Sequence, residues 1–260
     1  MAAALVVPPG FYIGSGSPVE AHSSLCAARK PGHIGGSVIR LFVGHDPRES
    51  IGTTVFTQSV LETTKAPVSI THLTPSLWIG QRDGTNAFTY SRFLVPALCD
   101  YQGWAIFADG ADMLCKADLE ELWSLRDPWK AVQVVKHEYK TKHPKKYIGT
   151  QMEAENRDYP RKNWSSLILW NCGHIHNRKL SPDWVQKMNG SHLHRFGWLL
   201  DDRIGEIPRE WNWLADEYGH AETAKILHWT AGIPGIRHYA DSPHANEWTA
   251  CLKRALRAGT

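Results

Sequence analysis

The 260-residue sequence has no hydrophobic run that approaches the roughly 20 residues needed to cross a bilayer. Its apolar start, residues 1–7, is short and has no basic region before it, which makes it a poor signal peptide. The five cysteines are scattered and include no CxxC pair, so neither a disulfide framework nor a zinc knuckle is indicated. These absences predict a cytoplasmic protein without a membrane span.

Neither positive nor negative charge is in large excess. With 29 basic and 26 acidic residues the formal net charge is only +3, and no Lys/Arg run forms a nucleic-acid stripe. We therefore expect no nucleic-acid partner. The most basic patch, residues 140–146, also holds histidine and proline and is typical of a loop. Such a patch can still meet a phosphorylated or acidic ligand.

The first 37 residues differ from the rest of the chain. Clusters of glycine, proline and serine interrupt them, and no periodic pattern continues between these clusters. We interpret residues 1–37 as a flexible or loosely packed leader, which is either an artefact of the start site or a functional arm. Residues 38–260 are predicted to form a single domain, and the oligomeric state is left open.

Short apolar runs alternate with amphipathic segments after this leader. Residues 38–43 predict a strand, residues 50–65 an amphipathic helix with Ile51, Val55, Val60 and Leu61 inside, and residues 68–73 a second strand. This order predicts an α/β fold with a Rossmann-like, mixed, mostly parallel sheet flanked by helices. Further strands are expected at 104–108, 129–135, 164–171 and 225–229, and helices at 86–101 (with Pro96 as a possible kink), 117–123, 182–188 and 247–256.

The strand at 104–108 leads directly into Asp109 and Asp112. Unpaired carboxylates at the end of a buried strand would cost several kcal/mol, so a cation, and most simply a divalent metal, should face them. The alternative is that one aspartate caps the next turn while the other is solvated. His228 lies at the tip of a separate short strand. A lone histidine is more often a core or surface residue, but a histidine with two carboxylates suits Mn²⁺.

Several segments, in this order, resemble the nucleotide-sugar-dependent glycosyltransferases of the GT-A fold. The nearest branch contains glycogenin and the bacterial lipopolysaccharide galactosyltransferases, and the match covers about residues 38–240. Any one motif is weak, whereas the ordered set is fairly specific. The matching segments are 43–46 (Val-Gly-His-Asp), 90–93 (Tyr-Ser-Arg-Phe), 105–114 (Ala-Ile-Phe-Ala-Asp-Gly-Ala-Asp-Met-Leu), 118–123, 165–172, 201–202 and 228–234 (His-Trp-Thr-Ala-Gly-Ile-Pro).

The resemblance implies three groups of site residues. A metal site for Mn²⁺ or Mg²⁺ would consist of Asp109, Asp112 and His228. Catalytic residues on the donor-sugar and acceptor side would be Asn171, Asp201 and Asp202. The nucleotide-sugar would contact Val43, Gly44, His45 and Asp46 through its base and ribose, and Tyr90, Arg92, Gly110, Ala111, Gly232 and Arg237 elsewhere.

Two departures from the family pattern matter. The family spaces its aspartates by one residue, but here Gly110 and Ala111 intervene. Asp112 is therefore the firmer ligand, while Asp109 either binds ribose or needs a bulged turn. The family also has a lysine and a tryptophan near the late proline. Gly235 follows Pro234 here, so the diphosphate contact is lost or comes from Arg237.

Plainer interpretations of the other candidates also stay open. Asp201 and Asp202 can serve as a helix cap and a surface ion pair with Arg203. Asn171 can be an ordinary turn residue at a strand end.

The predicted activity is metal-dependent transfer of a sugar from a nucleotide diphosphate donor, most simply a UDP-sugar. The acceptor would be a sugar, lipid or protein hydroxyl, and the resemblance favours retention of configuration. A nucleotidyltransferase or pyrophosphorylase is one alternative, although residues 44–48 lack the repeated glycines that it would need. A non-catalytic sugar-nucleotide-binding protein of the same fold is another, because the aspartate spacing is irregular.

Overall fold

The chain begins its fold with the predicted strand, helix and strand. A computed structural model describes residues 38–74 and 88–257. In it β1 (Ile39–Gly44) and β2 (Val68–Leu73) pair in parallel, joined by α1 (Ser50–Thr63). The predicted inner face of this helix is half wrong. Val55 and Val60 are buried, but Ile51 and Leu61 are exposed.

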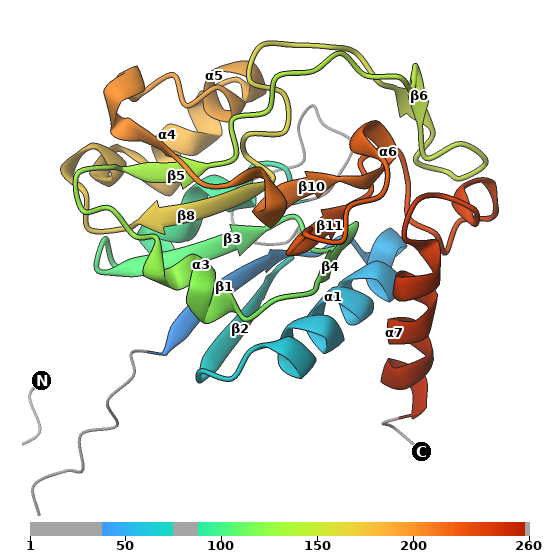
Figure 1. Cartoon of the computed structure of the whole chain (residues 1–260). Helices are drawn as coiled ribbons and strands as arrows, with labels where there is room; N and C mark the ends of the chain where they lie inside the picture. Colours follow the sequence, from blue (N-terminus) through green and yellow to red (C-terminus); the bar gives the residue numbers. More distant parts are fainter. Residues whose placement is uncertain (1–37, 75–87, 258–260) are drawn as a thin grey trace, which may run out of the picture. The chain divides into compact units, whose positions relative to one another are not determined.

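The central sheet has six strands in the order β2-β1-β3-β8-β5-β9 (Figure 1). Its other members are β3 (Trp104–Ala108), β8 (Leu167–Asn171), β5 (Val132–Val134) and β9 (Ile204–Glu206). Only β8 runs against its neighbours in this part of the described chain, because it pairs antiparallel with both β3 and β5. The prediction of a mixed, mostly parallel sheet is confirmed.

A second, smaller sheet was not predicted. It has the order β10-β11-β4, from β10 (Trp213–Leu214), β11 (Ile226–His228) and β4 (Met113–Cys115). β11 runs antiparallel to β4, with His228 opposite Met113. β11 confirms the strand predicted at 225–229, whereas β4 and β10, of three and two residues, carry too little periodic pattern to be recognised in a sequence.

The predicted helix at 86–101 is confirmed only in part, over Ser91–Leu98. Over these residues the chain forms a 3-10 turn, η2 (Ser91–Leu94), followed by the short α2 (Val95–Leu98). Pro96 lies in the first turn of α2, where its missing N–H costs nothing, so it kinks no helix.

The remaining helices are mostly short. They are α3 (Leu119–Ser124), α4 (Pro182–Lys187), α5 (Gly190–His194), α6 (Ala215–Tyr218) and α7 (Ala245–Arg257). Of these, α3, α4 and α7 lie near their predicted positions, whereas α5 and α6 were not predicted. Single 3-10 turns are η1 (Pro47–Glu49), η3 (Ile175–Lys179), η4 (Asp201–Arg203), η5 (Arg209–Asn212) and η6 (Arg237–Tyr239), and a small hairpin pairs β6 (Lys145–Lys146) with β7 (Ala154–Glu155).

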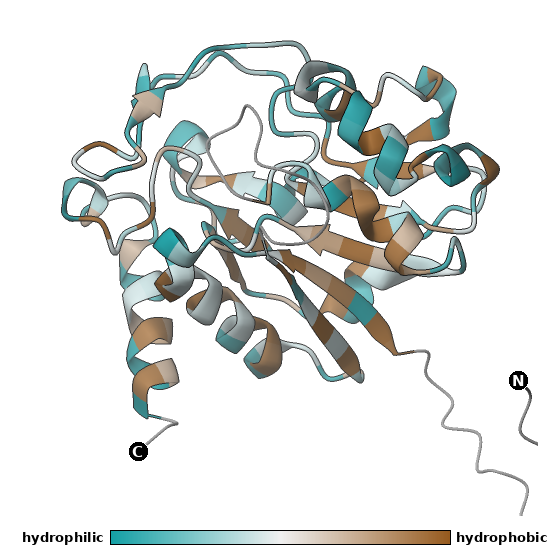
Figure 2. Ribbon diagram, turned by 180° about the vertical axis from the view of Figure 1, so that it is seen from behind, coloured by the Kyte–Doolittle hydropathy of each residue, from teal (hydrophilic) through white to brown (hydrophobic). Residues whose placement is uncertain are grey.

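Successive side chains of the central strands point into two different cores. Phe42 of β1 and Phe107 of β3 pack with side chains of α2, α4 and α5. Leu41 and Ile106, one residue before each, pack on the other face with side chains of α1 and α3. In Figure 2 the strands of this sheet are largely brown, in keeping with a sheet covered on both faces.

A third core joins α7 to the rest of the chain. Trp248 and Cys251 of α7 pack with Val55 of α1 and Leu227 of β11. The described residues, 38–74 and 88–257, belong to one compact unit. The predicted leader, residues 1–37, lies outside the described residues. Within the described part of the chain, no helix combines the length and apolar character needed to cross a membrane.

Candidate active site

The two aspartates lie on the turn that joins β3 to β4. Gly110 has a φ of +72°, a conformation that favours glycine, and a Cβ there would lie 2.3 Å from Cγ1 of Val43. The Ala111 N–H donates to the Asp109 carbonyl over 2.8 Å. This tight turn absorbs the extra residue between the aspartates, so both carboxylates reach the same cluster.

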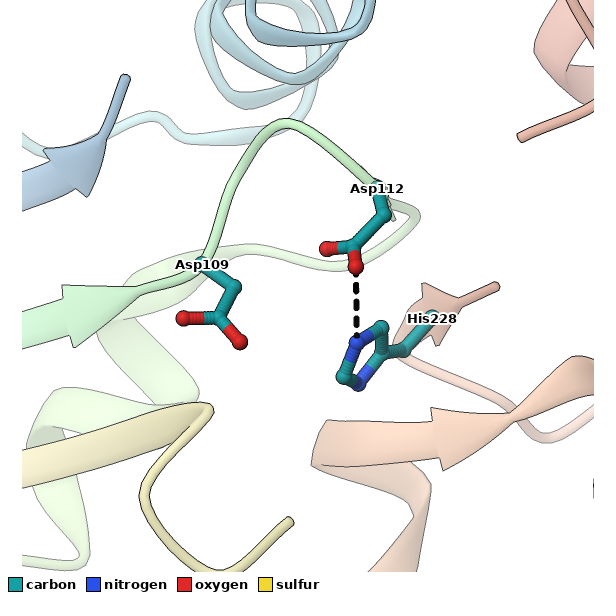
Figure 3. A group of neighbouring side chains, drawn as sticks. All are labelled: Asp109, Asp112 and His228. Carbon is teal, nitrogen blue, oxygen red and sulfur yellow. Dashed lines mark ion pairs between the residues drawn. The ribbon is translucent and has the colours of Figure 1, made fainter. Parts of the chain in front are cut away.

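His228 comes to these carboxylates from the smaller sheet. The antiparallel register of β11 and β4 places it beside the turn, and the Trp229 N–H donates to the Asp112 carbonyl over 2.9 Å. One ligand atom from each of Asp109, Asp112 and His228 lies within 4.8 Å of the other two. Figure 3 shows the three side chains converging, with His228 Nε2 at 3.3 Å from Asp112 Oδ2.

Asn212 sets the orientation of the His228 ring through a hydrogen bond to the ring nitrogen that faces away from the aspartates. Its Nδ1 lies 2.9 Å from Oδ1 of the fully buried Asn212, whose Nδ2 donates to Ser166 Oγ over 2.8 Å. An amide oxygen only accepts, so Nδ1 carries the hydrogen. In the neutral ring Nε2 then presents its lone pair to the aspartates, the arrangement usual for histidines that bind metals.

The chemistry of this cluster fits a divalent cation. Asp112 Oδ1 is buried and has no hydrogen-bond partner among the described residues. Burial raises the pKa of Asp109 to about 6, against the opposing effect of the Arg92 guanidinium. Burial lowers the pKa of His228, but the carboxylates of Asp112 and Asp109 outweigh it and the net shift is upward. Two carboxylates and one imidazole form a donor set that suits Mn²⁺.

Arg92 is buried and holds Asp109 in place. One guanidinium nitrogen lies 2.6 Å from Asp109 Oδ1 and donates to the Ser165 carbonyl over 2.8 Å, while Nε donates to Thr89. The guanidinium also lies over the rings of Phe88 and Phe107. Because Arg92 makes all these contacts, its main role is to hold the Asp109 carboxylate in position.

A cavity of about 180 Å³, here called the metal cavity, opens in front of the cluster. Its wall includes Lys146, from the basic patch noted in the sequence. Burial lowers the pKa of Lys146, and the carboxylates of Asp112, Asp109 and Glu49 oppose that shift. Sequence reasoning missed several other lining residues, namely Thr89, Tyr147, Tyr159, Asn163, Ser165, Ser166, His194 and Thr230.

The direction of β8 explains why Asn163, and not the predicted Asn171, lines the metal cavity. Because β8 is antiparallel to β3, its beginning, near Asn163 and Ser166, lies at the metal end of the sheet. Asn171, at its other end, stands opposite Trp104 and donates its amide to the carbonyls of Pro128 and Lys130. The structure therefore does not bring Asn171 to the metal cavity, and its predicted catalytic role has no support in this geometry.

Asp201 and Asp202 are also absent from the described walls of the metal cavity. They precede β9, which starts beside the start of β5, and both side chains are exposed. Asp201 pairs with Arg161, and Asp202 lies 3.4 Å from Arg203. The plainer surface ion-pair interpretation agrees with this geometry, and the catalytic one does not.

The turn after β1 lies at the same end of the sheet as the metal turn. Val43 is a core residue, and a Cβ on Gly44 would lie 2.3 Å from the Phe88 ring. His45 stacks on His72 at 5.8 Å, with Nδ1 at 3.3 Å from Thr53 Oγ1. Asp46 is buried, caps η1 and pairs with Arg48 at 2.6 Å.

The other predicted ligand contacts are scattered. A Cβ on Gly52 of α1 would lie 1.7 Å from the Ala111 carbonyl oxygen, so Ala111 contributes mainly backbone packing. Gly232 is buried against the ring of Tyr239. Arg237, in η6, is exposed and does not line the metal cavity.

Two further cavities adjoin the metal cavity. One, of about 290 Å³ and here called the tyrosine cavity, contains Tyr90 and shares Thr89, Tyr159 and His194 with it. The other, of about 390 Å³ and here called the Glu49 cavity, shares Tyr147.

Glu49 is a carboxyl that the sequence reasoning did not single out. It is 4% exposed, and neither of its oxygens has a hydrogen-bond partner among the described residues. Burial, with help from the charge of Asp112, raises its pKa to about 8.

Comparison with known proteins places these features in context. No family profile matches the chain. Solved structures with a similar fold include the bifunctional glycosyltransferase WbbM (13% identity, TM-score 0.61, 83% of this chain and 50% of that one). The chain thus spans half the length of WbbM. The galactosyltransferase LgtC with donor and acceptor sugar analogues (12% identity, TM-score 0.54, 83% and 96%) and GlyE of Streptococcus pneumoniae (11%, 0.53, 86% and 64%) are also similar.

A much closer sequence relative is Protein CDI of Arabidopsis thaliana. The two are 41% identical over an alignment 223 residues long, which covers 80% of this chain and 84% of that protein. The solved structures above establish the predicted GT-A fold. The chain therefore belongs to the family of Arabidopsis thaliana Protein CDI and has the fold of the GT-A glycosyltransferases.

Proposed function

We propose that this protein is a metal-dependent glycosyltransferase that moves a sugar from a nucleotide diphosphate donor to an acceptor hydroxyl. The observation that carries the proposal is the cluster of Asp109, Asp112 and His228, preorganised by Asn212 at the ligand-binding end of a GT-A sheet. Mn²⁺ is the preferred cation and Mg²⁺ the second choice, as the mixed oxygen and nitrogen donors support.

The reaction leaves extra negative charge on the departing diphosphate. The acceptor oxygen bonds to the anomeric carbon, the bond from that carbon to the diphosphate oxygen breaks, and the leaving oxygen keeps the electron pair and takes the hydroxyl proton. A bound divalent cation stabilises this charge as it develops. Lys146, on the wall of the same cavity, adds a positive charge.

The order of the three cavities supports a direction for the donor. The Glu49 cavity lies beside η1, after β1, and contains Arg48 and Ile51 with Ile233 and Ile236, so it suits a flat nucleoside base. The diphosphate then occupies the metal cavity. The sugar extends toward Ser165 and His194, where the metal and tyrosine cavities meet. UDP remains the expected nucleotide, and retention the expected stereochemistry.

The predicted nucleotide contacts enter this proposal with different roles. Val43, Gly44, His45 and Asp46 shape the turn beside the nucleoside, and Gly110 and Ala111 shape the metal turn. Gly232 supports the segment behind the Glu49 cavity, while exposed Arg237 has no assigned role. The four described cysteines are buried free thiols, which fits a reducing compartment such as the cytosol.

The first experiment measures metal-dependent nucleotide binding by thermal shift. UDP with Mn²⁺ should raise the melting temperature of the full chain, because a ligand that binds only the folded state stabilises it. UDP without metal should have little effect. Asp112→Ala should abolish the metal-dependent shift, whereas the matched surface variant Asp202→Ala should keep it. A shift that survives in Asp112→Ala would remove this residue from the site.

The second experiment separates catalysis from binding. A panel of nucleotide sugars is incubated with protein and Mn²⁺, and the released nucleoside diphosphate is measured. Release from one donor supports a transferase. Formation of a nucleoside triphosphate from donor and pyrophosphate would instead favour a pyrophosphorylase, and binding without any turnover would favour a non-catalytic sugar-nucleotide-binding protein.

A further inference from the structure

The tyrosine cavity opens from the metal cavity on the side where the donor sugar would end. Thr89, Tyr159 and His194 belong to both walls, so a molecule in one cavity touches the same side chains as a molecule in the other. At about 290 Å³ the tyrosine cavity has room for a monosaccharide-sized ligand. A Cβ on Gly190 would lie only 3.0 Å from the Tyr90 hydroxyl, so glycine leaves room for this tyrosine in the wall of the cavity.

The charge in this cavity is unbalanced. Arg195 lines it, and within residues 38–74 and 88–257 its guanidinium has no carboxylate partner. Its Nε is buried without a hydrogen-bond partner among the same residues. The two other arginines nearby are paired, Arg92 with Asp109 and Arg161 with Asp201. The described lining contains no acidic side chain, so Arg195 has no counter-charge in the described wall of the cavity.

The neighbouring groups are neutral hydrogen-bonding partners. His194 lies with Nδ1 at 2.7 Å from Ser165 Oγ. Burial, together with the positive charges of Arg92 and Lys146, lowers its pKa to about 3, so the ring is neutral. Thr89, Tyr159 and Ser191 add hydroxyl groups. Such a set recognises the hydroxyls of a polyhydroxylated ligand, and the phenol ring of Tyr159 offers a face on which a sugar can stack.

We propose that the tyrosine cavity is the acceptor subsite and that it selects an anionic, hydroxyl-bearing acceptor whose carboxylate or phosphate pairs with Arg195. The inference rests on the proposed transferase function, because it places the acceptor hydroxyl where His194, Tyr159 and Thr89 border the metal cavity. A guanidinium pairs with either anion through two parallel hydrogen bonds, and a neutral sugar would leave it unpaired. The charge of the acceptor is therefore the main basis of selection.

The test compares sugars that carry a carboxylate, a neutral hydroxymethyl group or a phosphate at carbon 6. Binding of methyl β-D-glucuronide, methyl β-D-glucoside and glucose 6-phosphate is measured on the full chain by saturation-transfer NMR with Mg²⁺ and UDP present. We expect an anionic sugar to bind roughly tenfold tighter than the glucoside or better, as for a hydrogen bond to a charged group. The glucuronide and the phosphate report separately which anion is preferred.

Variants assign the effect to one side chain. Arg195→Met should remove the preference for anionic sugars, Arg195→Lys should keep part of it, and the matched exposed variant Arg178→Met should keep all of it. Circular dichroism confirms that each variant is folded. Equal binding of neutral and anionic sugars by the wild type, or an unchanged preference in folded Arg195→Met, would overturn the proposal.

The same samples separate this inference from the proposed function. If UDP with Mn²⁺ produces no thermal shift while an anionic sugar still binds through Arg195, the subsite stands and the transferase proposal fails. If nucleotide binding is metal-dependent but the sugars show no charge preference, the transferase proposal stands and the acceptor assignment fails.

Discussion

Asn212 is the residue whose substitution should report most directly on the proposed metal site. Its Oδ1 accepts from His228 Nδ1, and no other described side chain holds that nitrogen. Asn212→Ala should therefore weaken Mn²⁺ binding by roughly 10–100-fold, as expected for loss of a partner that orients a ligand. Isothermal titration calorimetry measures the change. Asn171→Ala, at the far end of the sheet, is the matched control, and equal losses in both variants would refute the orienting role.

Glu49 should make the metal-free protein less stable at high pH. Its folded-state pKa is about 8, above the ordinary value of 4.5, so its contribution to stability is complete below pH 4.5 and lost as pH rises through 8. Glu49→Gln cannot ionise. Relative to wild type, we expect it to raise the free energy of unfolding at pH 9 by roughly 2–4 kcal/mol more than at pH 4.

Urea unfolding at pH 4, 7 and 9, with EDTA present, measures this difference for Glu49→Gln. Glu120→Gln, on the surface of α3, serves as the matched control and should show no such trend. A Glu49→Gln effect that stays constant across the three pH values would mean that this carboxyl does not titrate as its burial requires.

At the scale of elements, α1 packs closely against the metal turn because Gly52 has no side chain. A Cβ on Gly52 would overlap the Ala111 carbonyl at 1.7 Å, and backbone cannot move aside cheaply. Gly52→Ala should destabilise the fold by roughly 1–3 kcal/mol and weaken Mn²⁺ binding, because helix and turn must separate. Chemical denaturation and calorimetry measure the two effects.

Gly173→Ala is the control for this variant, since the nearest atom to its Cβ would be at an ordinary 3.6 Å. If Gly52→Ala were as stable and bound metal as tightly as Gly173→Ala, the close contact of α1 with the turn would be wrong.

Among the elements, strand bounds could be predicted from the sequence, but strand direction could not. The bounds of β2 and β3 and the strand–helix–strand order follow from apolar runs and turn residues, which are local signals. The direction of β8 is not local. A strand has the same alternation whichever way it runs, so the sequence led to Asn171 when the metal end of β8 is its beginning.

At the scale of the whole molecule, α7 links the C-terminal region to α1 and to the segment after β11. Trp248 is 2% exposed, and its ring lies against Gly235. Trp248→Ala should lower the free energy of unfolding by roughly 3–5 kcal/mol, the usual cost of truncating a buried aromatic side chain. Leu256→Ala, at a site 65% exposed, should change it by less than about 0.5 kcal/mol. Similar effects of the two substitutions on urea unfolding would contradict this docking of α7.

The sequence by itself led to the GT-A fold, through its resemblance to known glycosyltransferases, and to Asp112 and His228 as candidate metal ligands. These follow from local patterns and from the order of short motifs along the chain. Only the tertiary structure decided that Asp109 shares the cluster with Asp112, through the left-handed turn at Gly110. It also brought Asn212, Lys146 and His194 to the site, each from a segment without a diagnostic pattern. The physical reason is that these contacts depend on strand direction and on long-range packing, which a linear pattern does not encode.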